Sequence, residues 1–182
     1  MAQEAALDLL LALVRGRRRL GERLLARPEA SLPALMRFVR DERPAARLLA
    51  CACIAALAET GACAPAACWH ELLAVLHATV RLLAAPSRAA LEHAPEVIGA
   101  LLRCHPTLHR LVGEAGAVAP LVAQAGAAGA SARQQELSLR ALALISAESD
   151  GLRAVVAAAG AVPLARDALR APAAGVRVAA CH

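Results

Sequence analysis

The chain has 182 residues, of which 59% are hydrophobic and 1% aromatic, and its formal net charge is +5. This apolar content excludes a disordered chain, because disordered chains contain too few apolar residues to form a core. Ala occurs 50 times and Leu 31 times, whereas β-sandwiches and barrels favour β-branched and aromatic residues. The composition therefore predicts an all-α protein, either one domain of ordinary size or a short array of repeats.

The positive charge is a weak argument for nucleic-acid binding. All 20 basic residues are Arg, and Lys, Asn and Tyr are absent, which is typical of a GC-rich gene rather than of selection for phosphate contacts. One Trp and one Phe also leave little to stack on bases. No segment has the pattern of a signal peptide or a transmembrane helix. We therefore expect a cytoplasmic protein, soluble and intracellular, that binds neither nucleic acid nor a membrane.

The predicted helices follow one another in a regular order. The first covers residues 2–15, where apolar residues fall on one face. A short, a medium and a long helix are then predicted in each of four segments, although the short helix of the second segment is degenerate over 60–68. The predicted helices are 17–27, 31–41 and 44–59; 69–85 and 87–103; 106–114, 118–128 and 131–148; and 150–159, 162–170 and 174 to the end.

Helix-ending and helix-starting residues stand where these elements need them. Gly116 and Gly160 each end a short helix, where glycine takes left-handed dihedral angles without strain. Ser131 and Asp150 are predicted N-caps. A proline is predicted in the first turn of three medium helices, where its missing N–H costs nothing. These prolines are Pro33, Pro120 and Pro163.

Three sets of residues recur with nearly the same period. Gly116 and Gly160 are 44 residues apart. A leucine recurs at steps of 44 and 43 residues, at Leu57, Leu101 and Leu144. An arginine recurs at steps of 41, 45 and 44 residues, at Arg47, Arg88, Arg133 and Arg177. A shared period of this length indicates a helical repeat array.

The repeated segment resembles the signature of the armadillo repeat family. It reads Glu-Ala-Gly-Ala-Val-Ala-Pro-Leu at 114–121 and Ala-Ala-Gly-Ala-Val-Pro-Leu at 158–164, is partial at 32–35 and is missing at 68–75. HEAT repeats have a similar period but two helices and no such turn. The resemblance implies a right-handed α-solenoid of about four armadillo-like three-helix repeats.

The resemblance covers nearly the whole chain and is clearest over 106–182, so we expect residues 1–182 to form a single repeat domain. We expect units at about 17–59, 60–103, 104–148 and 149–182, with 1–16 as the remnant of a preceding unit. The last long helix would stop at His182 after about nine residues, where about 16 are typical of the others. We therefore expect a fragment of a longer protein.

The resemblance also implies what the protein does. Armadillo proteins are peptide- and protein-binding scaffolds, so we expect a non-catalytic interaction scaffold, without a cofactor, that binds a partner in a concave groove lined by the long helices. One alternative is an Hsp70-type chaperone cofactor that promotes nucleotide exchange. Another is a structural arm of a larger kinase-like or ciliary scaffold. Importin-like members hold peptides with groove Asn residues, and this chain has none.

The recurring arginines are the predicted binding residues. Each lies near the start of a predicted long helix, so together they would form a ladder along the groove, and Arg suits bidentate contact with carboxylates. We therefore predict a protein partner with an acidic segment. The alternative is that these arginines are solvated and pack their stems between repeats. The four residues are Arg47, Arg88, Arg133 and Arg177.

Other candidate sites are weaker. His70 and Glu71 begin like the zinc-protease helix motif, but Ala74 stands where that motif needs its second His. Pro106 is expected to put His105 in a turn, apart from His109 on the next helix. Cys63, Cys68 and His70 form another loose cluster. We predict no metal site, no enzyme activity, and six reduced cysteines that are mostly buried.

Overall fold

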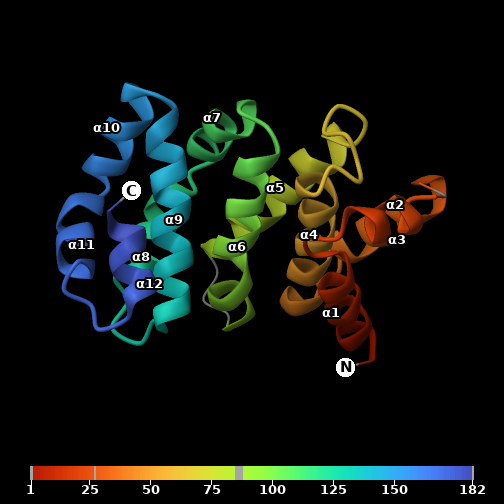
Figure 1. Cartoon of the computed structure of the whole chain (residues 1–182), viewed down its shortest axis with the longest axis horizontal. Helices are drawn as coiled ribbons and strands as arrows, with labels where there is room; N and C mark the ends of the chain where they lie inside the picture. Colours follow the sequence, from red (N-terminus) through yellow and green to blue (C-terminus); the bar gives the residue numbers. More distant parts are fainter. Residues whose placement is uncertain (1, 27, 85–87, 182) are drawn as a thin grey trace. The chain divides into compact units, whose positions relative to one another are not determined.

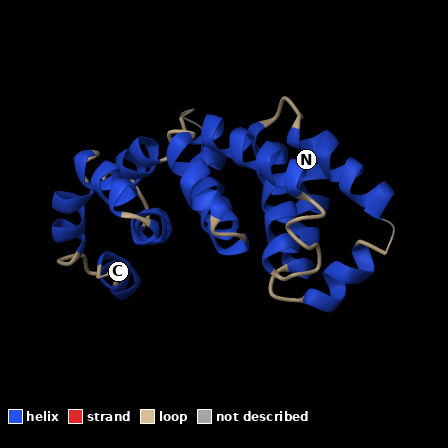
Figure 2. Ribbon diagram, turned by 90° about the horizontal axis from the view of Figure 1, so that it is seen from above, coloured by secondary structure: helices blue, strands red, loops and turns tan. Residues whose placement is uncertain are grey.

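The computed structural model describes residues 2–26, 28–84 and 88–181, with their side chains except at 28–30 and 88–92. Over these residues the chain forms twelve α-helices and no β-strand (Figures 1 and 2). The all-α prediction is therefore confirmed. Within the described ranges, no helix combines the length and the hydropathy that crossing a bilayer would require. The chain divides into two compact units, Met1–Cys104 and His105–His182.

The first unit is built around one nearly enclosed helix, α4. Every residue from 48 to 58 of α4 is buried, because α1, α3, α5 and α6 all pack against it. A helix covered on all sides has to be apolar all round, which is the pattern of this segment. The helices of this unit are α1 (Ala2–Val14), α2 (Arg18–Leu24), α3 (Pro28–Val39), α4 (Pro44–Glu59), α5 (Trp69–Leu83) and α6 (Arg88–Cys104).

The second unit is built around α9, which packs against α7, α8, α10 and α12. Leu139 of α9 joins Ala125, Val176 and Ala179 in a cluster of buried side chains. A central long helix surrounded by shorter ones therefore organises this unit as well. Its helices are α7 (Thr107–Glu114), α8 (Val118–Ala125), α9 (Ala132–Glu148), α10 (Asp150–Ala158), α11 (Ala161–Ala168) and α12 (Ala174–Ala180).

Two repeat-marking glycines join successive helices in this unit. Gly116 follows α7 with φ of +81°, and Gly160 follows α10 with φ of +94°. These angles lie in the left-handed region, which a side chain makes costly. The prediction of left-handed helix ends at both positions is confirmed.

The N-caps of this unit agree with the sequence at one position and differ at another. Ser131 caps α9, with its Oγ accepting the Gln134 N–H at 3.3 Å and the Gln134 side chain accepting the Ser131 N–H at 2.7 Å. The prediction for Asp150 is wrong by one residue. Ser149 has the extended backbone of a cap, and its Oγ accepts the N–H of Leu152 at 3.2 Å. Asp150 is the first helical residue instead.

The prolines also require one correction. Pro120 and Pro163 are each the third residue of their helices, α8 and α11, and so lie in the first turn as predicted. Pro33 lies inside α3, because that helix begins at Pro28 rather than at residue 31. Proline has a fixed φ that suits a first helical turn, so Pro28 is a favourable start for this helix.

Candidate partner-binding site

The long helices of the first unit share one cavity. α4 packs against both α1 and α6. A cavity of about 460 Å³ is lined by residues of α4 and its end, of α6, of the turn after α1 and of the start of α2. Small side chains form its floor, because Ala52, Ala56 and Ala100 are only 6–7% exposed. Five charged side chains also reach it: Arg15, Arg18, Glu59, Glu96 and Arg103. This cavity, with its floor of small residues and the five charged side chains that reach it, is called the long-helix cavity below.

The lining of the long-helix cavity follows the repeat. Ala56 and Ala100 are 44 residues apart, as are Gly16 and Thr60. Three charged residues with the same spacing lie at the carboxyl ends of α1, α4 and α6. They are Arg15, Glu59 and Arg103. Equivalent positions of stacked repeats face the same way, so a sequence period becomes a continuous surface. These three residues, with alternating charge, are the signal in the sequence that could have indicated the cavity.

Two ion pairs cross the long-helix cavity. Arg15 lies 3.0 Å from Glu96 and thereby joins the end of α1 to α6. The Nε of Arg103 lies 2.7 Å from Glu59 and joins α6 to α4. Both arginine side chains are nearly half exposed, at 48% and 47%. Ion pairs with arginines this exposed contribute only about 0.2–1 kcal/mol each to stability.

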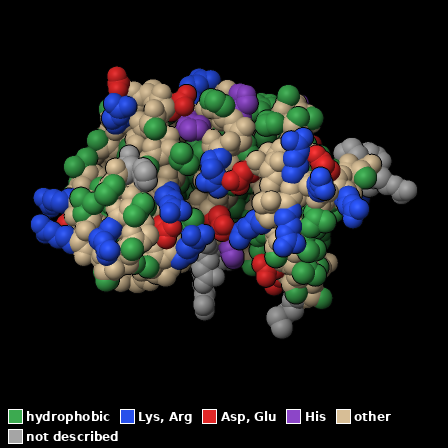
Figure 3. Space-filling view, viewed as in Figure 1, with side chains coloured by type: hydrophobic (Ala, Val, Ile, Leu, Met, Phe, Trp, Pro, Cys, Tyr) green, Lys and Arg blue, Asp and Glu red, His purple; other side chains and the backbone are tan. Residues whose placement is uncertain are grey.

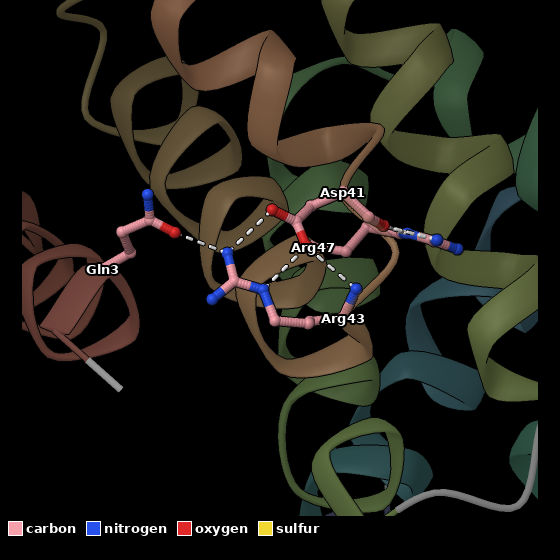
Figure 4. Close-up of polar contacts among 4 residues, drawn as sticks. All are labelled: Gln3, Asp41, Arg43 and Arg47. Carbon is pink, nitrogen blue, oxygen red and sulfur yellow. Dashed lines mark hydrogen bonds and ion pairs between the residues drawn. The ribbon is translucent and has the colours of Figure 1, made fainter.

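Arg47 lies on the other side of α4 from this cavity. An α-helix turns by roughly 100° per residue, which puts Arg47 on the side opposite Ala56. Its guanidinium donates from Nε to the backbone oxygen of Asp41 at 2.9 Å, and Nη2 donates to the same oxygen (Figure 4). The donors of Arg47 are thus directed at its own loop.

The other recurring arginines differ from one another in their surroundings. Arg177 donates from Nη1 to the backbone oxygens of Ala171 at 2.9 Å and Pro172 at 2.8 Å. Arg133 is 61% exposed and lies 3.7 Å from Glu136. The Arg88 side chain lies outside the described residues. Arg47 and Arg177 are the fourth residues of their helices, whereas Arg133 is the second, so the period does not give these arginines one helical register.

The histidines are engaged separately in the second unit. His105 lies in the link between α6 and α7, where its Nδ1 accepts the N–H of Thr107 at 3.2 Å. On α7, the Nδ1 of His109 donates to the Leu144 oxygen at 3.0 Å and lies 3.5 Å from Glu148. Within the described part of the chain, no three His, Cys, Asp or Glu side chains form a group that could hold a metal ion.

Solved structures share this architecture. A designed armadillo repeat protein in complex with the peptide (KR)4 matches with a TM-score of 0.77 and 20% identity, over 98% of this chain and 72% of that one. Computationally designed armadillo repeat proteins for modular peptide recognition match with a TM-score of 0.76 and 23% identity, over 97% of this chain and 71% of theirs.

An engineered protein also matches, with a TM-score of 0.78 and 18% identity, over 97% of this chain and 69% of that one. The sequence itself matches no protein-family model and no curated protein. The resemblance to armadillo repeats drawn from the sequence is confirmed at the level of the fold. The chain has the armadillo repeat fold.

Proposed function

We propose that the chain is a non-catalytic scaffold that binds a protein partner at the long-helix cavity. The observation that carries this proposal is a cavity lined by equivalent positions of successive long helices, with small residues on its floor. Small floor residues allow an extended segment of a partner to approach closely. Charged side chains around the floor then provide specificity through their spacing.

The charges of the cavity favour an acidic segment. Three arginines and two glutamates line it, so the lining has one more positive than negative side chain. The third arginine, Arg18, also lies 2.8 Å from Glu22 outside the lining. The designed armadillo protein described above is in complex with the peptide (KR)4. The excess of Arg in the cavity of this chain favours a segment of the opposite, negative charge. Partner carboxylates would contact Arg15 and Arg103, where Arg can make two hydrogen bonds to one carboxylate.

The ladder of Arg47, Arg88, Arg133 and Arg177 stays a second hypothesis for the acidic contact. The exposure of Arg133 is compatible with it. Arg47 and Arg177 donate hydrogen bonds to backbone carbonyls of their own preceding loops. These bonds give the two arginines a structural role that needs no partner. Both hypotheses predict an acidic partner and differ in the arginines that hold it.

A quantitative pull-down with charge-reversal variants tests both hypotheses. Proteins captured from cell extract by the 182-residue chain are compared with those captured by Arg15→Glu/Arg103→Glu and by Arg88→Glu/Arg133→Glu. Arg166→Glu/Arg170→Glu is the control, because it changes the net charge equally at two exposed positions of the second unit. Loss of the same proteins with the first variant alone supports the long-helix cavity.

Other outcomes separate the hypotheses. Loss only with Arg88→Glu/Arg133→Glu would favour the ladder and reject the cavity. Equal loss with all three variants would indicate general charge attraction, which falls steeply with salt, and would reject both specific sites. Circular dichroism of each variant shows whether the helical content is retained.

A further inference from the structure

A second hollow of the first unit is apolar and shares no residue with the long-helix cavity. It has a volume of about 450 Å³ and lies between α1, α2 and α3, within the size range of roughly 300–1,000 Å³ that ligand clefts occupy. Its largest side chains are Leu7, Leu10, Leu24, Leu35 and Phe38. This hollow is called the apolar cleft below.

The polar side chains that reach the apolar cleft are already engaged. The Oγ of Ser31 donates to the backbone oxygen of Leu24 at 2.7 Å. The Oε1 of Gln3 accepts from Nη2 of Arg43 at 2.6 Å, and Arg43 in turn pairs with Asp41 at 2.8 Å (Figure 4). The cleft therefore offers apolar contact to a partner rather than free hydrogen-bonding groups.

The apolar surface continues from the cleft onto α1. Leu9 is 63% exposed and Leu13 is 42% exposed, and Figure 3 shows hydrophobic side chains gathered over α1, with arginines over the neighbouring α2 and α3. An exposed apolar patch with a polar border is typical of a surface that binds another molecule.

The two walls of the cleft opposite α1 carry an excess of positive charge. Arg23 and Arg37 are exposed and directly precede the lining residues Leu24 and Phe38 in the sequence, so each side chain projects roughly 100° around its helix from a lining residue. Arg19 and Arg40 are also exposed on this part of the chain. Two acids of this part of the chain are paired, since Glu22 lies 2.8 Å from Arg18 and Asp41 pairs with Arg43.

Of the two acidic residues of α1, Glu4 directly follows the lining residue Gln3 and is close enough to act on Arg43, whereas Asp8 lies away from the cleft. The residues of α1 that line the cleft, such as Gln3 and Leu10, fall on one side of that helix. By the helical turn of roughly 100° per residue, Asp8 lies about on the opposite side. The border of the cleft on α2 and α3 is therefore basic.

We infer that the apolar cleft binds an acidic amphipathic helix of a partner protein. Such a helix presents apolar anchors at positions i, i+3 or i+4, and i+7, which suits a hollow of leucines and Phe38. Acidic residues beside the anchors would meet Arg23 and Arg37. This charge complementarity fits an acidic partner and disfavours a symmetric contact between two copies, because that contact would bring the same arginines together.

Synthetic peptides test the inference directly. One probe is a fluorescent helical peptide of about fifteen residues, with Leu at i, i+3, i+4 and i+7 and Glu at most other positions. A second probe replaces each Glu by Lys. We expect fluorescence anisotropy to show micromolar binding of the acidic peptide to the 182-residue chain, with affinity falling as salt is raised. The basic peptide should bind at least about tenfold more weakly.

Variants at exposed lining residues locate the binding without disturbing the core. Ala6 and Ala34 line the cleft and are exposed, so Ala6→Gln/Ala34→Gln fills it from the outside. We expect this variant and Arg23→Glu/Arg37→Glu each to weaken binding by about tenfold or more. The control Arg166→Glu/Arg170→Glu should bind as the wild type does, and circular dichroism should show unchanged helicity in all three.

Several outcomes would overturn the inference. These are no binding of the acidic peptide, equal binding of both peptides, or equal loss in the control variant. If the chain sediments with anionic phospholipid vesicles and the acidic peptide does not compete for this binding, the surface binds a membrane instead. A dimer that Ala6→Gln/Ala34→Gln disrupts would assign it to a second copy. Arg15→Glu/Arg103→Glu should leave peptide binding unchanged, which separates this test from that of the long-helix cavity.

Discussion

The guanidinium of Arg47 is hydrogen-bonded to the backbone carbonyl of Asp41, six residues earlier in the chain. Arg177 makes the equivalent contact in the second unit, where its Nη1 lies 2.9 Å from the oxygen of Ala171. In both cases the arginine is the fourth residue of its helix and the carbonyl belongs to the preceding loop. The arginine thereby ties the loop to the helix that follows.

This contact predicts a stability role for Arg47. Replacing Arg47 by Ala removes the hydrogen bonds to the Asp41 carbonyl and should lower the free energy of unfolding by about 1–2 kcal/mol. Urea unfolding followed by circular dichroism measures the change. The control is Arg40→Ala, since Arg40 is exposed and has no side-chain hydrogen bond among the described residues. Equal effects of the two substitutions would contradict the prediction.

Gly21 allows α2 to pack closely against the end of α4. A Cβ at this position would lie 2.6 Å from the Cβ of Ala62 and 3.0 Å from Cδ2 of Leu57. Gly21→Ala should therefore lower the thermal unfolding midpoint, because overpacking costs roughly 1–3 kcal/mol. Gly129→Ala is the matched control, as a Cβ there meets nothing within 4 Å. A midpoint unchanged by Gly21→Ala would show that the contact relaxes freely.

Asp41 makes stability depend on pH in the acid range. The Arg43 guanidinium, which bonds both carboxylate oxygens, holds the pKa of Asp41 well below its usual range. The folded state then binds fewer protons than the unfolded state, in which the pKa is about 3.9. Its contribution to stability is therefore complete above about pH 5 and is lost as the pH falls towards the folded pKa.

The variant Asp41→Asn tests this linkage. We expect wild type to be more stable than the variant near neutral pH and the difference to shrink steadily below about pH 4. Urea unfolding at a series of pH values measures it. Asp167→Asn is the control, because Asp167 is 68% exposed and lies 3.7 Å from Arg166. A difference between wild type and Asp41→Asn that stays constant with pH would rule out the carboxylate charge as its cause.

The six free cysteines should differ sharply in reactivity. Burial raises the pKa of the Cys51, Cys53 and Cys104 thiols to about 12, so little reactive thiolate forms at neutral pH. Cys181 is exposed. Mass spectrometry after brief iodoacetamide treatment should find Cys181 modified first, and Cys51 and Cys53 modified only when urea unfolds the chain. Simultaneous modification of all sites would contradict the burial.

Part of the candidate site could be read from the sequence, and part could not. The period of 44 residues relates Arg15, Glu59 and Arg103, so their shared surface could have been predicted. The ion pair between Arg15 and Glu96 joins residues 81 positions apart that are not equivalent. A contact between non-equivalent positions depends on how α1 and α6 pack against α4, and no local sequence pattern specifies that packing.

The sequence by itself determined the helices, their order and the repeat. Helix formation and termination depend on nearby residues, as the left-handed angles at Gly116 and Gly160 and the cap at Ser131 show. Only the tertiary structure decided which face of each helix is open and which arginines are engaged. Arg47 recurs with the period, yet it contacts the Asp41 carbonyl on the side of α4 away from Ala56. Side-chain direction and long-range packing decide such contacts, and sequence spacing alone does not contain them.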